Sequence, residues 1–295
     1  MYSVISHEKL NYLLLFISIT AAVANSVLLH KREMTDNRTD PFMFNGIGSV
    51  IWIILLVLIN RGGLHLSRNT VLYGIVYGAV QILFLYFKLN AMERGAVSVT
   101  TLIGNCSMIF SVIVSMILWN EPVEILQWIG IAMLLVGVAI TSGTKNTGNN
   151  YERAWSFYVT GFFVLAGMVG IVFKMFSAAE GRQHYTDMFI IAAIFMSVCN
   201  FVISLKSVHR GNIYNKRDLF FALMCGVVSC VYNRLNAYLA GTLPGVIFFP
   251  VFNGSVIILS AAAGVIICKE RLGIIQILGF VMGVAALLLI GKVIV

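Results

Sequence analysis

The stretch YFKLNA at residues 86–91 and the stretch YNRLNA at residues 232–237 carry a tyrosine, a cation, a leucine, an asparagine and an alanine in the same order. Each lies near the end of a long apolar block, where a charge is costly. Their first residues are 146 positions apart (232 − 86). The match continues downstream to Glu121 and Glu270, where the offset is 149 (270 − 121). Ordered matches at polar positions indicate an internal duplication.

The composition places this duplication in a membrane. The chain has 295 residues, of which 59% are hydrophobic and 11% are charged, and its mean hydropathy is +0.92. A soluble domain of this length carries about 25% charged residues. The apolar residues form blocks of about 20, which match the thickness of the bilayer core. We therefore expect a multi-pass membrane protein.

The blocks predict ten membrane-spanning segments. All must be helices, because isolated strands leave backbone groups unsatisfied in lipid. The expected spans cover residues 10–30, 42–60, 70–92, 96–119, 124–143, 155–178, 186–205, 217–240, 243–267 and 272–292. The predicted fold class is thus an all-α integral membrane protein.

The duplication divides these spans into two repeats of five. We expect the first repeat at residues 1–143, a polar linker at 144–153 and the second repeat at 154–295. Because five is odd, the second repeat starts from the opposite face of the membrane and is inverted. Inverted repeats are typical of secondary transporters, which hold the substrate near the midplane and work by alternating access.

Two segments resemble a known family. WNEPVEILQWIG at residues 119–130 and CKERLGIIQILG at residues 268–279 look like the repeated glutamate-and-glycine pattern of the drug/metabolite transporter superfamily, in particular its ten-helix EamA-like transporters. The resemblance implies a transporter with a central cavity lined by the first four helices of each repeat. The fifth and tenth helices would be peripheral. We expect it in the plasma membrane, which is the inner membrane in bacteria.

The resemblance and the charge distribution disagree about orientation. The family resemblance implies cytoplasmic termini. Under that orientation five basic residues would fall on the cytoplasmic side and twelve on the outside. This distribution is the reverse of the positive-inside rule. The orientation therefore stays open at the level of sequence.

Polar residues within the predicted spans are the candidate substrate contacts. An amide in lipid is costly unless it bonds to another helix or faces a wet cavity, so interhelical bonding is the alternative for each asparagine and glutamine. For the cations the alternatives are a structural pair or a side chain that snorkels to the interface, which is how we interpret Lys174. The predicted group is Asn25, Gln81, Tyr86, Lys88, Asn90, Asn105, Tyr232, Asn233, Arg234, Asn236 and Asn253.

Backbone features near these residues give two further expectations. Pro250 lies three residues before Asn253 and removes one helical hydrogen bond, which frees a carbonyl. Glu121 and Glu270 each lie at the start of the following helix, where a carboxylate can cap free backbone N–H groups. A gating role is the alternative for these two glutamates.

The charges indicate the class of substrate. None of the twelve acidic residues is near the centre of a predicted span, which disfavours organic cations and proton coupling through a carboxylate. A cavity lined by Lys88 or Arg234 favours a small anionic or zwitterionic metabolite, such as an amino acid. Alternatives are a broad exporter of drugs or uncharged metabolites, and a flippase of a lipid-linked anion.

Other functions lack their motifs. The five histidines lie in predicted loops or at helix ends, with no H-E-x-x-H motif and no P-loop, so we expect no enzyme, no metal and no cofactor. The basic residues are scattered, which disfavours nucleic acid. The expected partners are a small-molecule substrate and membrane lipid. We expect a monomer, with a dimer through Gly279 and Gly283 of the tenth helix as the alternative.

Overall fold

The computed structural model of the chain describes residues 2–33, 39–60, 62–95, 97–141, 153–207, 215–268 and 274–292. The regular elements in these ranges are all helices, as lipid requires of a chain that must satisfy its own backbone hydrogen bonds. In chain order they are α1 (Tyr2–Glu33), α2 (Pro41–Ile59), α3 (Arg68–Arg94), α4 (Val97–Asn105), α5 (Met108–Trp119), α6 (Ile125–Thr141), α7 (Arg153–Glu180), the short 3₁₀ helix η1 (Arg182–His184), α8 (Tyr185–Ser207), α9 (Lys216–Ala240), α10 (Gly245–Cys268) and α11 (Ile274–Lys292).

Every predicted span corresponds to helix in the described residues. The helices α4 and α5 together fill the fourth predicted span, which is divided by a turn at Cys106 and Ser107. Six helices are long and apolar enough to cross a membrane, and the remaining four segments contain shorter apolar helices. The predicted all-α membrane fold with ten helical segments is confirmed.

The chain forms two compact units, each of which draws on both halves of the sequence. Unit 1 comprises Met1–Ile82 and Val172–Gly241, and unit 2 comprises Leu83–Ile171 and Thr242–Val295. The chain passes from one unit to the other within α3, within α7 and after α9. The compact units are therefore not the two predicted sequence repeats.

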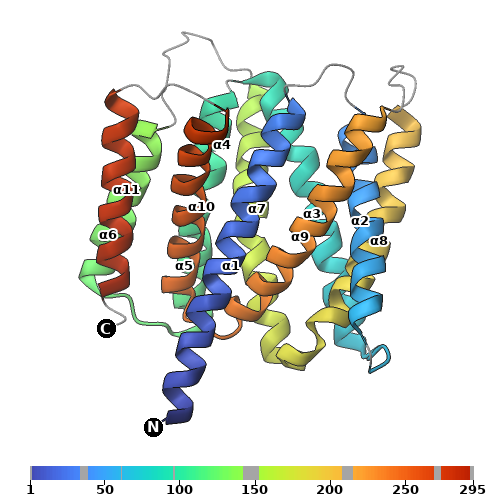
Figure 1. The fold of residues 1–295 in the computed structure, drawn as a ribbon, viewed down its shortest axis with the longest axis horizontal. Coiled ribbons are helices and arrows are strands. Elements are labelled where there is room, and N and C mark those ends of the chain that lie inside the picture. Colours follow the sequence, from blue (N-terminus) through green and yellow to red (C-terminus); the bar gives the residue numbers. More distant parts are fainter. Residues whose placement is uncertain are drawn as a thin grey trace. The chain divides into compact units, whose positions relative to one another are not determined.

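Helix pairing within each unit joins helices from the two halves of the sequence. In unit 1, α2 packs against α8 and α1 packs against α9; in unit 2, α5 packs against α10 and α6 against α11 (Figure 1). Three of these pairs join spans that the duplication makes equivalent: second with seventh, fourth with ninth and fifth with tenth. The repeat boundaries stay a prediction. Residues 144–152 of the expected linker lie outside the described residues, and Arg153 begins α7.

A buried ion pair ties together α1 and α9 in unit 1. Arg32 donates from Nε to Oδ1 of Asp218 at 2.7 Å and from Nη2 to Oδ2 at 3.1 Å. Arg32 also donates to the carbonyl oxygen of Thr39, whose amide in turn donates to Asp218 at 2.8 Å. The guanidinium lies 3.9 Å from the ring centroid of Phe44 in α2. Separating the two partners would leave an uncompensated buried charge, which is costly. The pair therefore holds the end of α1 beside the start of α9.

Aromatic side chains form the core of unit 1. The ring of Tyr77 in α3 stacks on Phe173 of α7 at 5.2 Å between centroids and meets Phe189 of α8 edge to face at 5.3 Å. Phe189 also meets Trp52 of α2 edge to face. Pairs of this geometry contribute about 0.5–1.5 kcal/mol each beyond area burial. The cluster therefore joins four helices of unit 1.

Glycines let α6 and α11 approach closely in unit 2. A methyl group added at Gly137 would lie 2.9 Å from the carbonyl oxygen of Gly279 and 3.1 Å from the amide nitrogen of Gly283. The Gly279 and Gly283 face thus packs against α6 of the same chain, which was one of its two expected uses. The oligomeric state stays a prediction.

Candidate functional site

The predicted substrate contacts are shared between the two units. Unit 1 holds Asn25, Gln81, Tyr232, Asn233, Arg234 and Asn236, and unit 2 holds Tyr86, Lys88, Asn90, Asn105 and Asn253. Each group is described within its own unit. The role of these residues in binding substrate stays a prediction, and their surroundings are as follows.

A hydrogen-bonded chain in unit 1 brings two predicted residues together. Gln81 donates from Nε2 to the hydroxyl of Tyr77 at 2.6 Å, and Tyr77 donates to Oδ1 of Asn233 at 3.2 Å. Asn233 donates to the backbone oxygen of Ser229, whose hydroxyl accepts from Nε1 of Trp52 at 2.9 Å. The chain joins α2, α3 and α9, so it includes the interhelical bonding that was the alternative for these amides.

Asn236 lies on the neighbouring part of α9 and faces α1. The hydroxyl of Ser18, which is fully buried, donates to Oδ1 of Asn236 at 2.8 Å and lies 3.3 Å from the backbone oxygen of Tyr232. In α1, Oδ1 of Asn25 is buried and has no hydrogen-bond partner among the described residues. An acceptor left unpaired in this way suits a ligand that donates hydrogen bonds.

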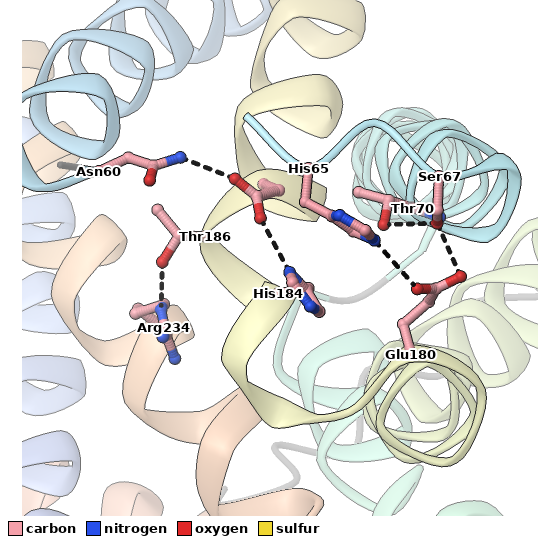
Figure 2. A network of polar contacts seen from close by, with 9 residues as sticks. Asn60, His65, Ser67, Thr70, Glu180, His184, Thr186 and Arg234 are labelled. Atoms are coloured by element: carbon pink, nitrogen blue, oxygen red, sulfur yellow. Dashed lines mark hydrogen bonds and ion pairs between the residues drawn. The ribbon is translucent and has the colours of Figure 1, made fainter. Parts of the chain in front are cut away.

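Arg234 is held by α8. Its Nε donates to Oγ1 of Thr186 at 3.2 Å (Figure 2). Its guanidinium lies 5.8 Å from the ring centroid of Tyr185. Asp187, next along α8, lies within electrostatic reach. These contacts correspond to the structural pair that the sequence left open for this cation.

The three predicted residues near the end of α3 lie in unit 2. Tyr86 is 43% exposed and meets Tyr158 of α7 at 6.2 Å between ring centroids. Asn90 donates to the backbone oxygen of Tyr86 and accepts from Nη1 of Arg94 at 2.7 Å. Lys88 is half-buried. Tyr86 and Asn90 are therefore engaged at the surface end of the helix.

The two equivalent asparagines of the fourth and ninth spans have different surroundings. Asn105 is the last residue of α4, directly before the turn at Cys106 and Ser107. Asn253 lies inside α10 and donates from Nδ2 to the backbone oxygen of Phe249 at 2.9 Å. α10 continues through Pro250, which the sequence predicts to remove one helical hydrogen bond. The turn that divides a helix lies instead in the fourth span, at Cys106 and Ser107.

Glu121 is a helix cap, but for a helix far away in the sequence. Its Oε2 accepts from the backbone amides of Gly245 at 2.7 Å and Val246 at 3.3 Å, at the start of α10. The sequence predicted capping of the helix that follows it, α6. The negative charge instead meets the positive end of α10. Glu270 lies outside the described residues.

Lys174 is the main residue that sequence reasoning misjudged. It was interpreted as a snorkelling side chain, yet it is only 6% exposed in α7. The position of Lys174 in its helix could have indicated this burial. Lys174 lies six residues before Glu180, the last residue of α7, and therefore about 9 Å from the helix end at 1.5 Å per residue. That depth is large for the reach of a lysine side chain.

The described residues contain no group of three His, Cys, Asp or Glu side chains placed to hold a metal ion. The polar groups described above are hydrogen-bond donors and acceptors, together with the cations Lys88, Lys174 and Arg234. Such groups can bind and orient a polar solute.

Comparisons with known proteins agree with the helical fold. The model of the EamA-like transporter family matches residues 9–143. A search of curated proteins finds no match. A solved structure titled "Crystal structure of protein" is similar with a TM-score of 0.75 and 13% sequence identity, covering 97% of each chain. At this identity the likeness shows the fold alone.

The family match covers the part of the chain that holds α1 to α6, including the segment at residues 119–130 that carries the resemblance. Residues 9–143 are therefore similar to the EamA-like transporter family, and the chain is a multi-pass membrane protein.

Proposed function

We propose that the protein transports a small anionic or zwitterionic metabolite, of amino-acid type, by alternating access in the plasma membrane. The family supplies the general activity of membrane transport. The class of substrate, the mechanism and the membrane are the new parts of the proposal.

The distribution of charge in the described spans carries this proposal. Lys88, Lys174 and Arg234 each lie six residues before the last residue of their helix (88 to 94, 174 to 180 and 234 to 240). The acidic residues of α3, α7, α8 and α9 lie in first or last turns. The deeper charges of these helices are thus all positive. A positive interior attracts carboxylates or phosphates and repels organic cations.

The unpaired acceptor in α1 favours a zwitterion over a simple anion. Oδ1 of Asn25 is buried without a partner among the described residues. An ammonium group has three N–H donors and would satisfy this oxygen. A carboxylate alone has no donor to offer when it is ionised. A substrate with both groups therefore suits both features.

The first experiment is a thermal-shift screen of the purified protein against metabolites grouped by charge. A bound ligand at a hundredfold excess over its dissociation constant stabilises by about 2.7 kcal/mol. We expect anions or zwitterions to raise the melting temperature. Lys174→Gln should remove the shift, whereas Lys206→Gln, an exposed lysine in the last turn of α8, should leave it.

Two outcomes decide the substrate class. Stabilisation only by cations or bulky neutral compounds would contradict the proposal and favour a broad exporter. With an amino acid as ligand, Asn25→Leu should weaken the shift, while the shift with the corresponding acid that lacks the amine should be unchanged. Exchange of labelled substrate across proteoliposomes, faster with unlabelled substrate on the opposite side, then tests alternating access.

A further inference from the structure

Two histidines outside the predicted substrate contacts stack on each other at one end of unit 1. His65 belongs to the connection between α2 and α3, and His184 is the last residue of η1. Their rings are 4.1 Å apart between centroids with an interplanar angle of 27°. The sequence placed both residues in loops or at helix ends, and it gave no reason to pair residues 119 positions apart (184 − 65).

Each ring has its own carboxylate (Figure 2). Nε2 of His65 lies 3.6 Å from Oε2 of Glu180, at the end of α7. Nδ1 of His184 lies 3.3 Å from Oδ2 of Asp187, in the first turn of α8. A proton on either ring is therefore next to a negative charge.

Neutral side chains hold both carboxylates in place. Ser67 donates to Oε1 of Glu180 at 2.6 Å and lies 2.9 Å from the hydroxyl of Thr70. Asn60 donates from Nδ2 to Oδ1 of Asp187 at 2.7 Å, and Asp187 is only 5% exposed. The carboxylates are thus positioned by α2, α3 and the connection between them. The histidine rings are the groups left to change charge.

The surrounding charges set how many protons the pair holds. Glu180 and Asp187 supply two negative charges, and Arg234 of α9, within electrostatic reach of Asp187, supplies one positive charge. With neutral rings the cluster has a net charge of −1 (−2 + 1). One proton neutralises it, whereas two would place two positive rings 4.1 Å apart. Arg182 of η1 lies within electrostatic reach of Tyr185 and is exposed, so water and salt screen its charge.

Solvent reaches His65 more readily than His184. The side chain of His65 is 50% exposed, whereas that of His184 is 24% exposed. Histidine is the side chain whose charge changes most readily near neutral pH. A proton from water can therefore reach His65 directly, beside the carboxylate of Glu180.

We infer that His65 and His184, with Glu180 and Asp187, form a binding site for a single proton. The bound proton joins the connection between α2 and α3 to the junction of α7 and α8 through one charge-assisted contact. Its loss leaves the cluster with an excess negative charge and loosens that contact. The inference concerns unit 1 alone and holds whatever the transported substrate is.

The test is a pH titration of the histidine resonances by NMR in untagged protein that carries ring-labelled histidine. Single substitutions assign the signals among the five histidines of the chain. Two sites that interact strongly take up their protons in two macroscopic steps that belong to the pair. We expect such two-step curves for His65 and His184 in the unsubstituted protein, and a single step for His65 in His184→Gln.

Two further variants keep the test decisive. Glu180→Gln removes one negative charge and should move the midpoint of His65 to lower pH, even if His184→Gln fails to fold. His30→Gln, in α1, is the matched control and should leave both curves unchanged. Single-step curves for both rings in the unsubstituted protein, unchanged by His184→Gln and Glu180→Gln, would overturn the inference.

Discussion

The fourth and ninth spans occupy equivalent places in the predicted repeats, yet only one of them is broken. The ninth, α10, contains Pro250 and stays helical from Gly245 to Cys268. The fourth has no proline within its helical residues and is divided at Cys106 and Ser107 into α4 and α5. The residue with the strongest tendency to break helices is therefore not where the break lies.

Packing against α7 accounts for the difference. A methyl group added at Gly104 would lie 2.2 Å from the ring of Phe162, and one added at Gly167 would lie 3.0 Å from the backbone oxygen of Ser107. Ser111 donates to the backbone oxygen of Gly167 at 2.9 Å. The turn is thus held by the surface of α7. A helix break in a membrane is tolerated where protein or a wet cavity covers the exposed backbone.

The largest expected effect is on the packing of the break. Gly167→Ala should destabilise the protein by about 2 kcal/mol, because the new methyl group meets a backbone oxygen and the ring of Phe110 and neither can move freely. Chemical unfolding in detergent measures this loss. Gly254→Ala in α10 is the matched control, because the atoms nearest to its methyl group are the side-chain ends of Leu134 and Leu287. Equal losses in both variants would contradict the special role of the break.

Asn105 and Asn253 test whether the break serves transport. Discontinuous helices in transporters present backbone and polar groups to the substrate. Asn105→Leu should therefore lower substrate affinity about tenfold, which corresponds to about 1.4 kcal/mol. Asn253→Leu should change it less, because Asn253 bonds to the backbone of its own helix. Binding measured by thermal shift for both variants compares the two spans directly, and a larger loss at Asn253 would reverse the assignment.

The smallest expected effect is at Pro250. Pro250→Ala restores one backbone hydrogen bond in a helix that is already continuous, so we expect a gain of about 1 kcal/mol, the net value of one such bond. Chemical unfolding of this variant, under the conditions used for the glycine variants, measures the change in the free energy of unfolding. A loss of transport at unchanged stability would instead show that the ninth span uses its proline to move.

The fold was predictable because lipid leaves a chain few options. Composition and block length predicted an all-helical membrane protein with ten segments. This prediction needs only the rule that every backbone group in lipid must form a hydrogen bond within the protein. The turn at Cys106 and Ser107 was not predictable, because it depends on contacts with α7. The cap of α10 by Glu121 was likewise hidden, since its partner is 124 residues away.

The sequence predicted which residues form the polar groups of the site, but not the residues to which they hydrogen-bond. The sequence placed Asn233 and Asn236 among the candidate contacts, and both are buried in α9. It did not reveal that Tyr77 and Ser18 would bond to them from other helices. Lys174 was misjudged for the same reason: distance along one helix gives its depth, but burial depends on the helices around it.

The ion pair of Arg32 and Asp218 has a consequence for how the protein is made. The partners are 186 residues apart, and at 5–20 residues per second the ribosome needs about 10–40 s to add that length. During this interval α1 is in the membrane and its arginine has no carboxylate from α9. The phosphate of an anionic lipid is the natural temporary counter-ion at that depth. The supply of anionic lipid should therefore affect the yield of newly synthesised protein more than the stability of the finished one.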